Sequence, residues 1–286
     1  MRIPVLALLL TCCGLASGAE GTITLVSSLP RTGSAKGQTD SMANGIRMAI
    51  AEVGGEIIGH RIEYLDWDDA SPERGAWDPA VEQANATKAI QNPDVMAYIG
   101  TYNSGAAKVV AAALNEAGLA MVSPANTAVG LTKPGAEKDE PAKYRPSGKV
   151  TYFRVVPADD IQGSQGANWA KALGAKTVYI LHDRELYGEG LAKVFKKHAE
   201  SIGLKVAGME GINPRDANYR SLVVKIDAAK ADLVYFGGTT QTNAGQLAKD
   251  LKNGGSPAKL MVPDGCYEQA FIESAGADAL EGRAFI

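Results

Sequence analysis

Residues 95–127 have the sequence VMAYIGTYNSGAAKVVAAALNEAGLAMVSPANT. The apolar run 95–99 predicts a buried strand, and the small and apolar residues of 104–117 predict a helix that Gly118 ends. The next apolar run, 119–122, predicts a second strand. A helix that connects two neighbouring strands makes those strands parallel and covers one face of their sheet. The stretch therefore predicts an α/β fold.

The same alternation extends along the chain in two series. Before the quoted stretch, strands are predicted at 22–26 and 61–66 and helices at 39–53 and 79–90. The charged, proline-bearing stretch 133–149 then interrupts the pattern, and we interpret it as a surface loop without core residues. A strand at 152–156 leads from this loop into the second series. That series has strands at 177–181, 204–209, 233–236 and 259–262, and helices at 162–173, 189–202, 219–229 and 243–253. We predict two doubly wound lobes, 20–158 and 159–286, joined near residues 155–160.

Composition agrees with this organisation and excludes some functions. The chain has 286 residues, more than one hydrophobic core usually needs, and 45% of them are hydrophobic. Its 29 basic and 32 acidic residues give a net charge of −3, and there is no long basic run. The sequence therefore offers no electrostatic footprint for nucleic acid.

The first nineteen residues have the pattern of a secretory signal peptide. Arg2 precedes a short apolar stretch at 3–10, and Ser17-Gly18-Ala19 forms a small-x-small cleavage site. The apolar stretch is too short to cross a bilayer. We therefore expect a soluble, exported protein located in the periplasm.

Two of the three cysteines lie inside this predicted signal. After cleavage Cys266 would be the only thiol, which excludes an internal disulfide. The alternative is a lipoprotein acylated at Cys12 or Cys13, although neither cysteine follows the small residue that lipidation normally requires.

Polar residues gather where the predicted strands end. Ligands of open α/β sheets bind beyond the carboxyl ends of the strands. The loop 100–105 (GTYNSG) has the glycine spacing of a phosphate-binding loop, but Ala106 and Ala107 replace its Lys and hydroxyl residue. Nucleotide hydrolysis is therefore disfavoured, whereas the helix start and the Ser104 hydroxyl suit a carboxylate. The alternative is that Asn103 or Ser104 only caps its own helix.

Other exits offer complementary groups. Thr127 follows the next strand within 123–127 (SPANT), and Asp264 follows the last predicted strand. An acid at that exit is solvated by default, but it would supply the opposite charge to a ligand ammonium.

Several segments, in order, resemble a known family. These are 44–50 (NGIRMAI), 68–70 (DDA), 98–100 (YIG) with Ser104, 123–124 (SP) with Thr127, 182–183 (HD), 187–190 (YGEG) and 235–238 (YFGG). From about residue 22 to the end, the chain is similar to type I periplasmic solute-binding proteins of the leucine/isoleucine/valine-binding group, the receptors of ABC importers. The resemblance implies two Rossmann-like lobes that are joined by a hinge and close on an amino acid.

The resemblance also implies ligand-binding residues. Ser104, Ala125 and Thr127 would hold the α-carboxylate and part of the ammonium, Tyr187 would close from the second lobe, and Asp264 would pair with the ammonium.

Three positions depart from the family pattern. Asp264 replaces the usual Glu, and Thr239 and Gln38 stand where aromatic residues are common. We therefore expect a more polar or roomier pocket, whose ligand is an amino acid, an amide or an aromatic acid. Family members also continue beyond Ile286, so we expect a fragment whose first lobe is incomplete at the C-terminus.

The predicted function is that of a monomeric receptor that hands its ligand to a membrane permease and needs no cofactor. A sensor with the same fold, acting through a membrane kinase, is an open alternative. An exported enzyme is disfavoured, because no G-x-S-x-G motif surrounds Ser104 and the three histidines lack metal-ligand spacing. We interpret Asp66, Asp68 and Asp69 as a solvated strand exit rather than a metal loop.

Overall fold

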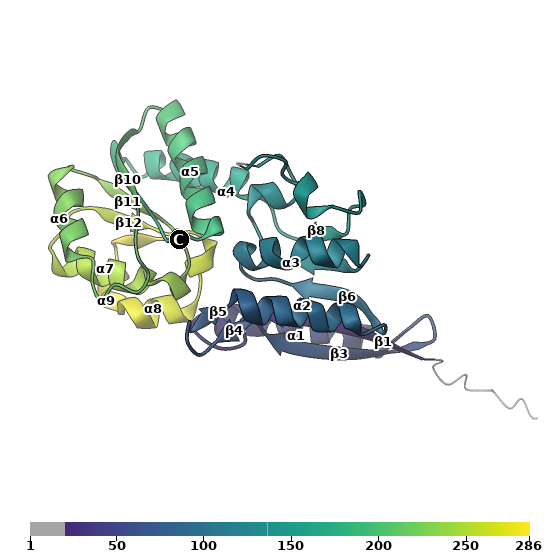
Figure 1. Ribbon diagram of the computed structural model, residues 1–286. Coiled ribbons are helices and arrows are strands. Elements are labelled where there is room, and N and C mark those ends of the chain that lie inside the picture. The colour runs from purple at the N-terminus through teal and green to yellow at the C-terminus, as the bar shows by residue number, and fades with distance from the viewer. Residues whose placement is uncertain (1–20, 136) are drawn as a thin grey trace, which may run out of the picture.

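The structure is a computed structural model that describes residues 21–135 and 137–286. The chain forms two lobes, each built on its own parallel sheet (Figure 1). The predicted signal peptide and the alternative lipid attachment at Cys12 or Cys13 lie outside the described residues. None of the helices in the described part is long and apolar enough to cross a membrane.

The sheet of the first lobe has the strand order β2-β3-β1-β6-β7-β8. All neighbouring strands are parallel except β2 and β3, which form a hairpin. The strands are β1 (Thr22–Leu29), β2 (Glu56–Ile57), β3 (His60–Asp68), β6 (Val95–Gly100), β7 (Ala120–Ser123) and β8 (Tyr152–Arg154), and a separate hairpin pairs β4 (Ala70–Ser71) with β5 (Ala76–Trp77).

Three helices cover this sheet: α1 (Lys36–Glu52), α2 (Pro79–Gln91) and α3 (Ser104–Glu116). The start of α2 shows how local sequence sets an element, because the Asp78 side chain accepts hydrogen bonds from the amides of Ala80 and Val81 and proline fills the first helical position. Two short 3₁₀ turns follow β7, η1 (Val129–Leu131) and η2 (Ala142–Tyr144).

The sheet of the second lobe has the order β10-β9-β11-β12-β13, again parallel. Its strands are β9 (Thr177–His182), β10 (Lys205–Gly211), β11 (Leu233–Gly237), β12 (Lys259–Met261) and β13 (Ala284–Phe285). Its helices are α4 (Asp159–Ala172), α5 (Leu186–Ser201), α6 (Arg220–Ala228), α7 (Ala244–Asn253), α8 (Gln269–Ala275) and α9 (Ala277–Leu280), with 3₁₀ turns η3 (Thr240–Thr242) and η4 (Asp264–Cys266).

Glycines bring the start of α5 against the end of β11. A Cβ atom on Gly188 would lie 2.3 Å from the carbonyl oxygen of Gly237, so only glycine permits this approach. Beneath it, the rings of Phe195 and Tyr235 stack with centroids 3.8 Å apart. The 187–190 and 235–238 segments therefore dock a helix start directly on a strand exit.

The predicted α/β architecture is confirmed, and the long elements lie within a few residues of their predicted positions. One interpretation was wrong: the 133–149 stretch does contribute to the core, because Tyr144 is buried against the first lobe. The tyrosine was overlooked because charged neighbours surround it in sequence.

Candidate functional site

A cavity of about 1250 Å³ lies between the two lobes. Its first-lobe wall comes from the start of α1 and from the loops after β6 and β7, and its second-lobe wall comes from α4, α5 and the loops after β11 and β12. All the residues predicted to bind ligand line it: Gln38, Ser104, Ala125, Thr127, Tyr187, Thr239 and Asp264. Ser104 and Asp264, 160 positions apart in sequence, therefore face one shared space.

Hydroxyl groups and a helix start form the first-lobe wall. Ser104 is the first residue of α3 and only 2% exposed, and its Oγ accepts a hydrogen bond from the Ala128 amide at 3.3 Å. Neither Asn103 nor Ser104 makes a capping hydrogen bond to α3, so the capping alternative is not observed. The Oγ1 atom of Thr127 is buried beside the carboxyl group of Asp159, whose pKa burial raises to about 8. These hydroxyls and the positive end of α3 form a pole suited to an anion.

Ala125 lies between these two hydroxyl residues. Its amide donates to Ser123 Oγ at 3.1 Å, so the group that Ala125 can offer a ligand ammonium is its carbonyl oxygen. Ala125 can therefore only accept a hydrogen bond from a ligand, through its carbonyl oxygen.

The opposite wall carries Asp264 in η4. Tyr187 Oη and Gln162 Nε2 each donate a hydrogen bond of 2.6 Å to Asp264 Oδ1. Because both donors use the same oxygen, Oδ2 of this exposed carboxylate remains for a ligand. Burial raises the pKa of Tyr187, which keeps its hydroxyl protonated as a donor.

Gln38 connects the two lobes over the cavity. From α1, its Nε2 donates to the carbonyl oxygens of Asp264 (3.1 Å) and Tyr267 (3.2 Å), and its Oε1 accepts from Tyr102 Oη at 2.9 Å. Where the family pattern has an aromatic residue, this chain has a polar bridge between α1 and η4.

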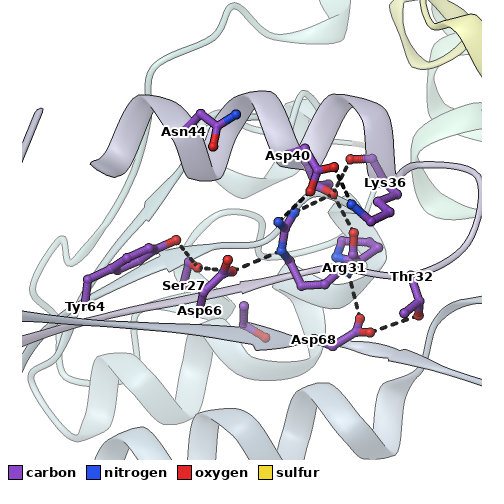
Figure 2. Close-up of polar contacts among 12 residues, drawn as sticks. Ser27, Arg31, Thr32, Lys36, Asp40, Asn44, Tyr64, Asp66 and Asp68 are labelled. Carbon is purple, nitrogen blue, oxygen red and sulfur yellow. Dashed lines mark hydrogen bonds and ion pairs between the residues drawn. The ribbon is translucent and has the colours of Figure 1, made fainter. Parts of the chain in front are cut away.

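An ionic cluster holds the N-terminal half of α1 on the sheet. Figure 2 shows Arg31 between β3 and α1: its Nε lies 3.1 Å from Asp66 Oδ1, and its Nη2 lies 2.7 Å from Asp40 Oδ1. Asp68 accepts the Arg31 amide at 2.8 Å. The interpretation of Asp66, Asp68 and Asp69 as a solvated exit was wrong. Arginine side chains pair with Asp66, backbone N–H groups donate hydrogen bonds to Asp68, and Asp69 is fully buried.

Thr239 lines the cavity as the residue immediately before η3. Its backbone N–H donates a hydrogen bond to Thr242 Oγ1 at 2.9 Å.

Sequence reasoning missed Gln162, Tyr102 and Glu268, which also line the cavity. Two of them position predicted residues, since Gln162 holds Asp264 and Tyr102 holds Gln38. Only their place beside strand exits could have indicated them.

Nothing in the described residues resembles a catalytic or metal centre. No cluster of three His, Cys, Asp or Glu side chains could hold a metal ion within 21–135 and 137–286. Cys266 is fully buried, and burial raises the pKa of its thiol, so the reactive thiolate is disfavoured.

Comparison with known proteins decides the family. Residues 22–286 match the family model described as periplasmic binding protein. The chain belongs to this family. Its two-lobed architecture and the cavity between the lobes are thus those of a periplasmic binding protein.

Two relatives and two solved structures illustrate the similarity. The chain is 31% identical over 269 residues to the leucine-, isoleucine-, valine-, threonine-, and alanine-binding protein of Pseudomonas aeruginosa, covering 93% of this chain and 66% of that protein. It is 30% identical to the Leu/Ile/Val-binding protein BraC3 of Rhizobium johnstonii, with 93% and 68% covered. The leucine binding protein LivK of Thermotoga maritima superposes with a TM-score of 0.76 at 23% identity, covering 89% of this chain and 67% of that one.

A solute binding protein of an ABC transporter from R. palustris, solved in complex with 4-hydroxybenzoate, has a TM-score of 0.76 at 22% identity, with 90% and 66% covered. The chain thus spans about two thirds of the length of the curated relatives it matches. These relatives are binding proteins and not enzymes, in agreement with the prediction.

Proposed function

We propose that this periplasmic binding protein is an extracytoplasmic receptor that captures an amino acid between its lobes. One observation carries the proposal: Ser104 and Asp264 line a single cavity from opposite lobes. The helix start and hydroxyls would hold the α-carboxylate, and the available oxygen of Asp264 would accept the α-ammonium.

The two poles explain how binding would favour closure. A ligand shifts a conformational equilibrium only when it binds one conformation better than the other. An amino acid that touches residues of both 20–158 and 159–286 has this property, because opening the lobes would break one set of contacts. We propose these ranges as the two rigid bodies and the segment near 155–160 as a hinge.

The names of the relatives support an amino acid as the cargo and the periplasm as the location. We propose delivery of the ligand to the permease of an ABC importer, by a monomeric receptor. Signalling through a membrane kinase is the second candidate, and the surface presented by the closed lobes would serve either partner.

A thermal-shift screen of the twenty amino acids, with benzoate and 4-hydroxybenzoate, tests the proposal. We expect at least one amino acid to raise the melting temperature in a concentration-dependent manner, because a ligand that binds only the folded state stabilises it. Recovery of the ligand chemically unchanged is also expected. Stabilisation by aromatic acids alone, or turnover of the ligand, would contradict the proposal.

The variant Ser104→Ala is expected to weaken binding of that amino acid by about 10-fold. It removes one hydroxyl donor to the carboxylate, and a hydrogen bond to a charged group contributes roughly 1.5–3 kcal/mol, partly retained by Thr127 and the helix start. Isothermal titration calorimetry measures the change. Ser201→Ala, an exposed serine at the end of α5, is the control and should leave the affinity unchanged. Equal affinities for Ser104→Ala and wild type would remove Ser104 from the site.

A further inference from the structure

The cavity contains a second carboxylate, Glu268, which no contact described above explains. It lies immediately before α8, and its carboxylate is buried beside the Thr240 side chain, without a cationic partner among the described residues. Its Oε2 would be 3.8 Å from a Cβ atom on Gly37, so the side chain reaches across to the start of α1. Burial raises the pKa of Glu268. A desolvated acid without a cationic partner is costly, and a cation beside it would remove this cost.

The charges of the cavity are all of one sign. Among the described residues that line it, Asp264 and Glu268 are the charged ones, and no Lys, Arg or His is present. The anion pole at Ser104 is built from dipoles and hydroxyls, and burial raises the pKa of Asp159, the acid beside Thr127, to about 8. A ligand with one carboxylate and two positive groups therefore balances the cavity, whereas a simple zwitterion leaves one acid unpaired.

The polarity of the cavity agrees with such a ligand. Besides the residues already described, amide side chains of Gln165, Asn168 and Gln269 line it. A purely hydrocarbon side chain would cover these polar groups without hydrogen-bonding to them.

We propose that Glu268 selects an amino acid whose side chain ends in a cationic group, an ammonium or a guanidinium, and binds that group while Asp264 binds the α-ammonium. The inference rests on the proposed function and names the ligand class for the same site. An aromatic monocarboxylic acid would satisfy neither carboxylate, so the geometry disfavours that class.

Two matched ligand pairs test the proposal on the full chain by calorimetry. L-lysine and L-norleucine differ by the terminal ammonium, and L-arginine and L-citrulline differ by the charge of the terminal group. We expect wild type to bind the cationic member of each pair at least 10-fold more tightly. Glu268→Gln should weaken lysine and arginine by about 10-fold or more and change norleucine and citrulline by less than about 2-fold.

Glu273→Gln is the control: this exposed glutamate lies on α8, the helix that follows Glu268, and its variant should keep the wild-type preference. A wild-type preference for norleucine would overturn the inference. Equal weakening of the binding of all four ligands by Glu268→Gln would also overturn it. That result would mean that Glu268 acts through its contact with α1 in the other lobe and not through the ligand's terminal group. Tight, Asp264-dependent binding of neutral amino acids alone would refute the cationic class and leave the proposed function intact, whereas no amino acid binding would refute both.

Discussion

Replacing Asp264 with asparagine is expected to weaken amino acid binding by about 100-fold. The substitution preserves shape and the oxygen that accepts from Tyr187 and Gln162, but it removes the negative charge facing the ligand ammonium. A 100-fold loss corresponds to about 2.7 kcal/mol, within the range for truncating one partner of a hydrogen-bonded charge pair. This loss of affinity exceeds the one expected for Ser104→Ala. Several neutral donors would bind the ligand carboxylate together, whereas Asp264 alone supplies the negative charge for the ammonium.

Calorimetric titration of Asp264→Asn with the amino acid that most stabilises wild type measures the effect. Asp278→Asn is the matched control, because Asp278 is exposed at the second lobe's surface and pairs with Lys252 away from the cavity. Wild-type affinity in Asp264→Asn would show that the ammonium binds elsewhere.

The second large effect concerns stability, and it arises from Glu82 on α2. This side chain is fully buried and accepts hydrogen bonds from Ser28 Oγ at 2.5 Å and Tyr98 Oη at 2.8 Å. Burial raises its pKa from 4.5 to about 8. Between these values the folded chain keeps a proton that the unfolded chain has released, so the free energy of unfolding decreases as the pH rises.

One such group changes the free energy of unfolding by up to about 1.4 kcal/mol per pH unit, or about 4 kcal/mol between pH 5 and pH 8. Glu82→Gln cannot ionise, so we expect it to lose much less stability over this interval and to exceed wild type at pH 8. Urea unfolding at both pH values measures the difference. The buried Asp69, Asp159 and Asp183, whose pKa values burial also raises, should leave a residual decrease in the variant.

Glu73→Gln, an exposed neighbour in the first lobe, should follow the wild-type pH dependence. Parallel stability curves for wild type and Glu82→Gln would contradict a protonated Glu82 in the folded chain.

Local sequence patterns were sufficient to predict the fold. The apolar run at 95–99 and the glycine after 104–117 predicted β6 and α3 closely, because strand and helix periodicities are properties of neighbouring residues. Short elements such as β2 and the β4–β5 hairpin were missed, since two-residue strands have no periodicity. Tyr144 was missed because it is buried by first-lobe core residues that are distant from it in sequence.

The site was likewise predicted only where local sequence carried the information. Strand exits indicated Ser104 and Asp264, and the structure places both on one cavity. Other side chains position these residues, and no sequence motif marks them. Gln162, for example, donates to Asp264 from a helix 102 positions earlier in the chain. Asp66 illustrates the converse: its charge suggested solvent, but the partner that neutralises it, Arg31, lies on the loop after another strand.

Calorimetry with ligand analogues tests the two-pole account most directly. The probes are the tightest-binding amino acid, the same molecule without its α-amino group, and its α-carboxamide, each titrated into wild type, Asp264→Asn and Ser104→Ala. We expect Asp264→Asn to lose affinity only for ligands that retain the ammonium, and Ser104→Ala only for ligands that retain the carboxylate. Losses that do not depend on which end of the ligand was altered would contradict it.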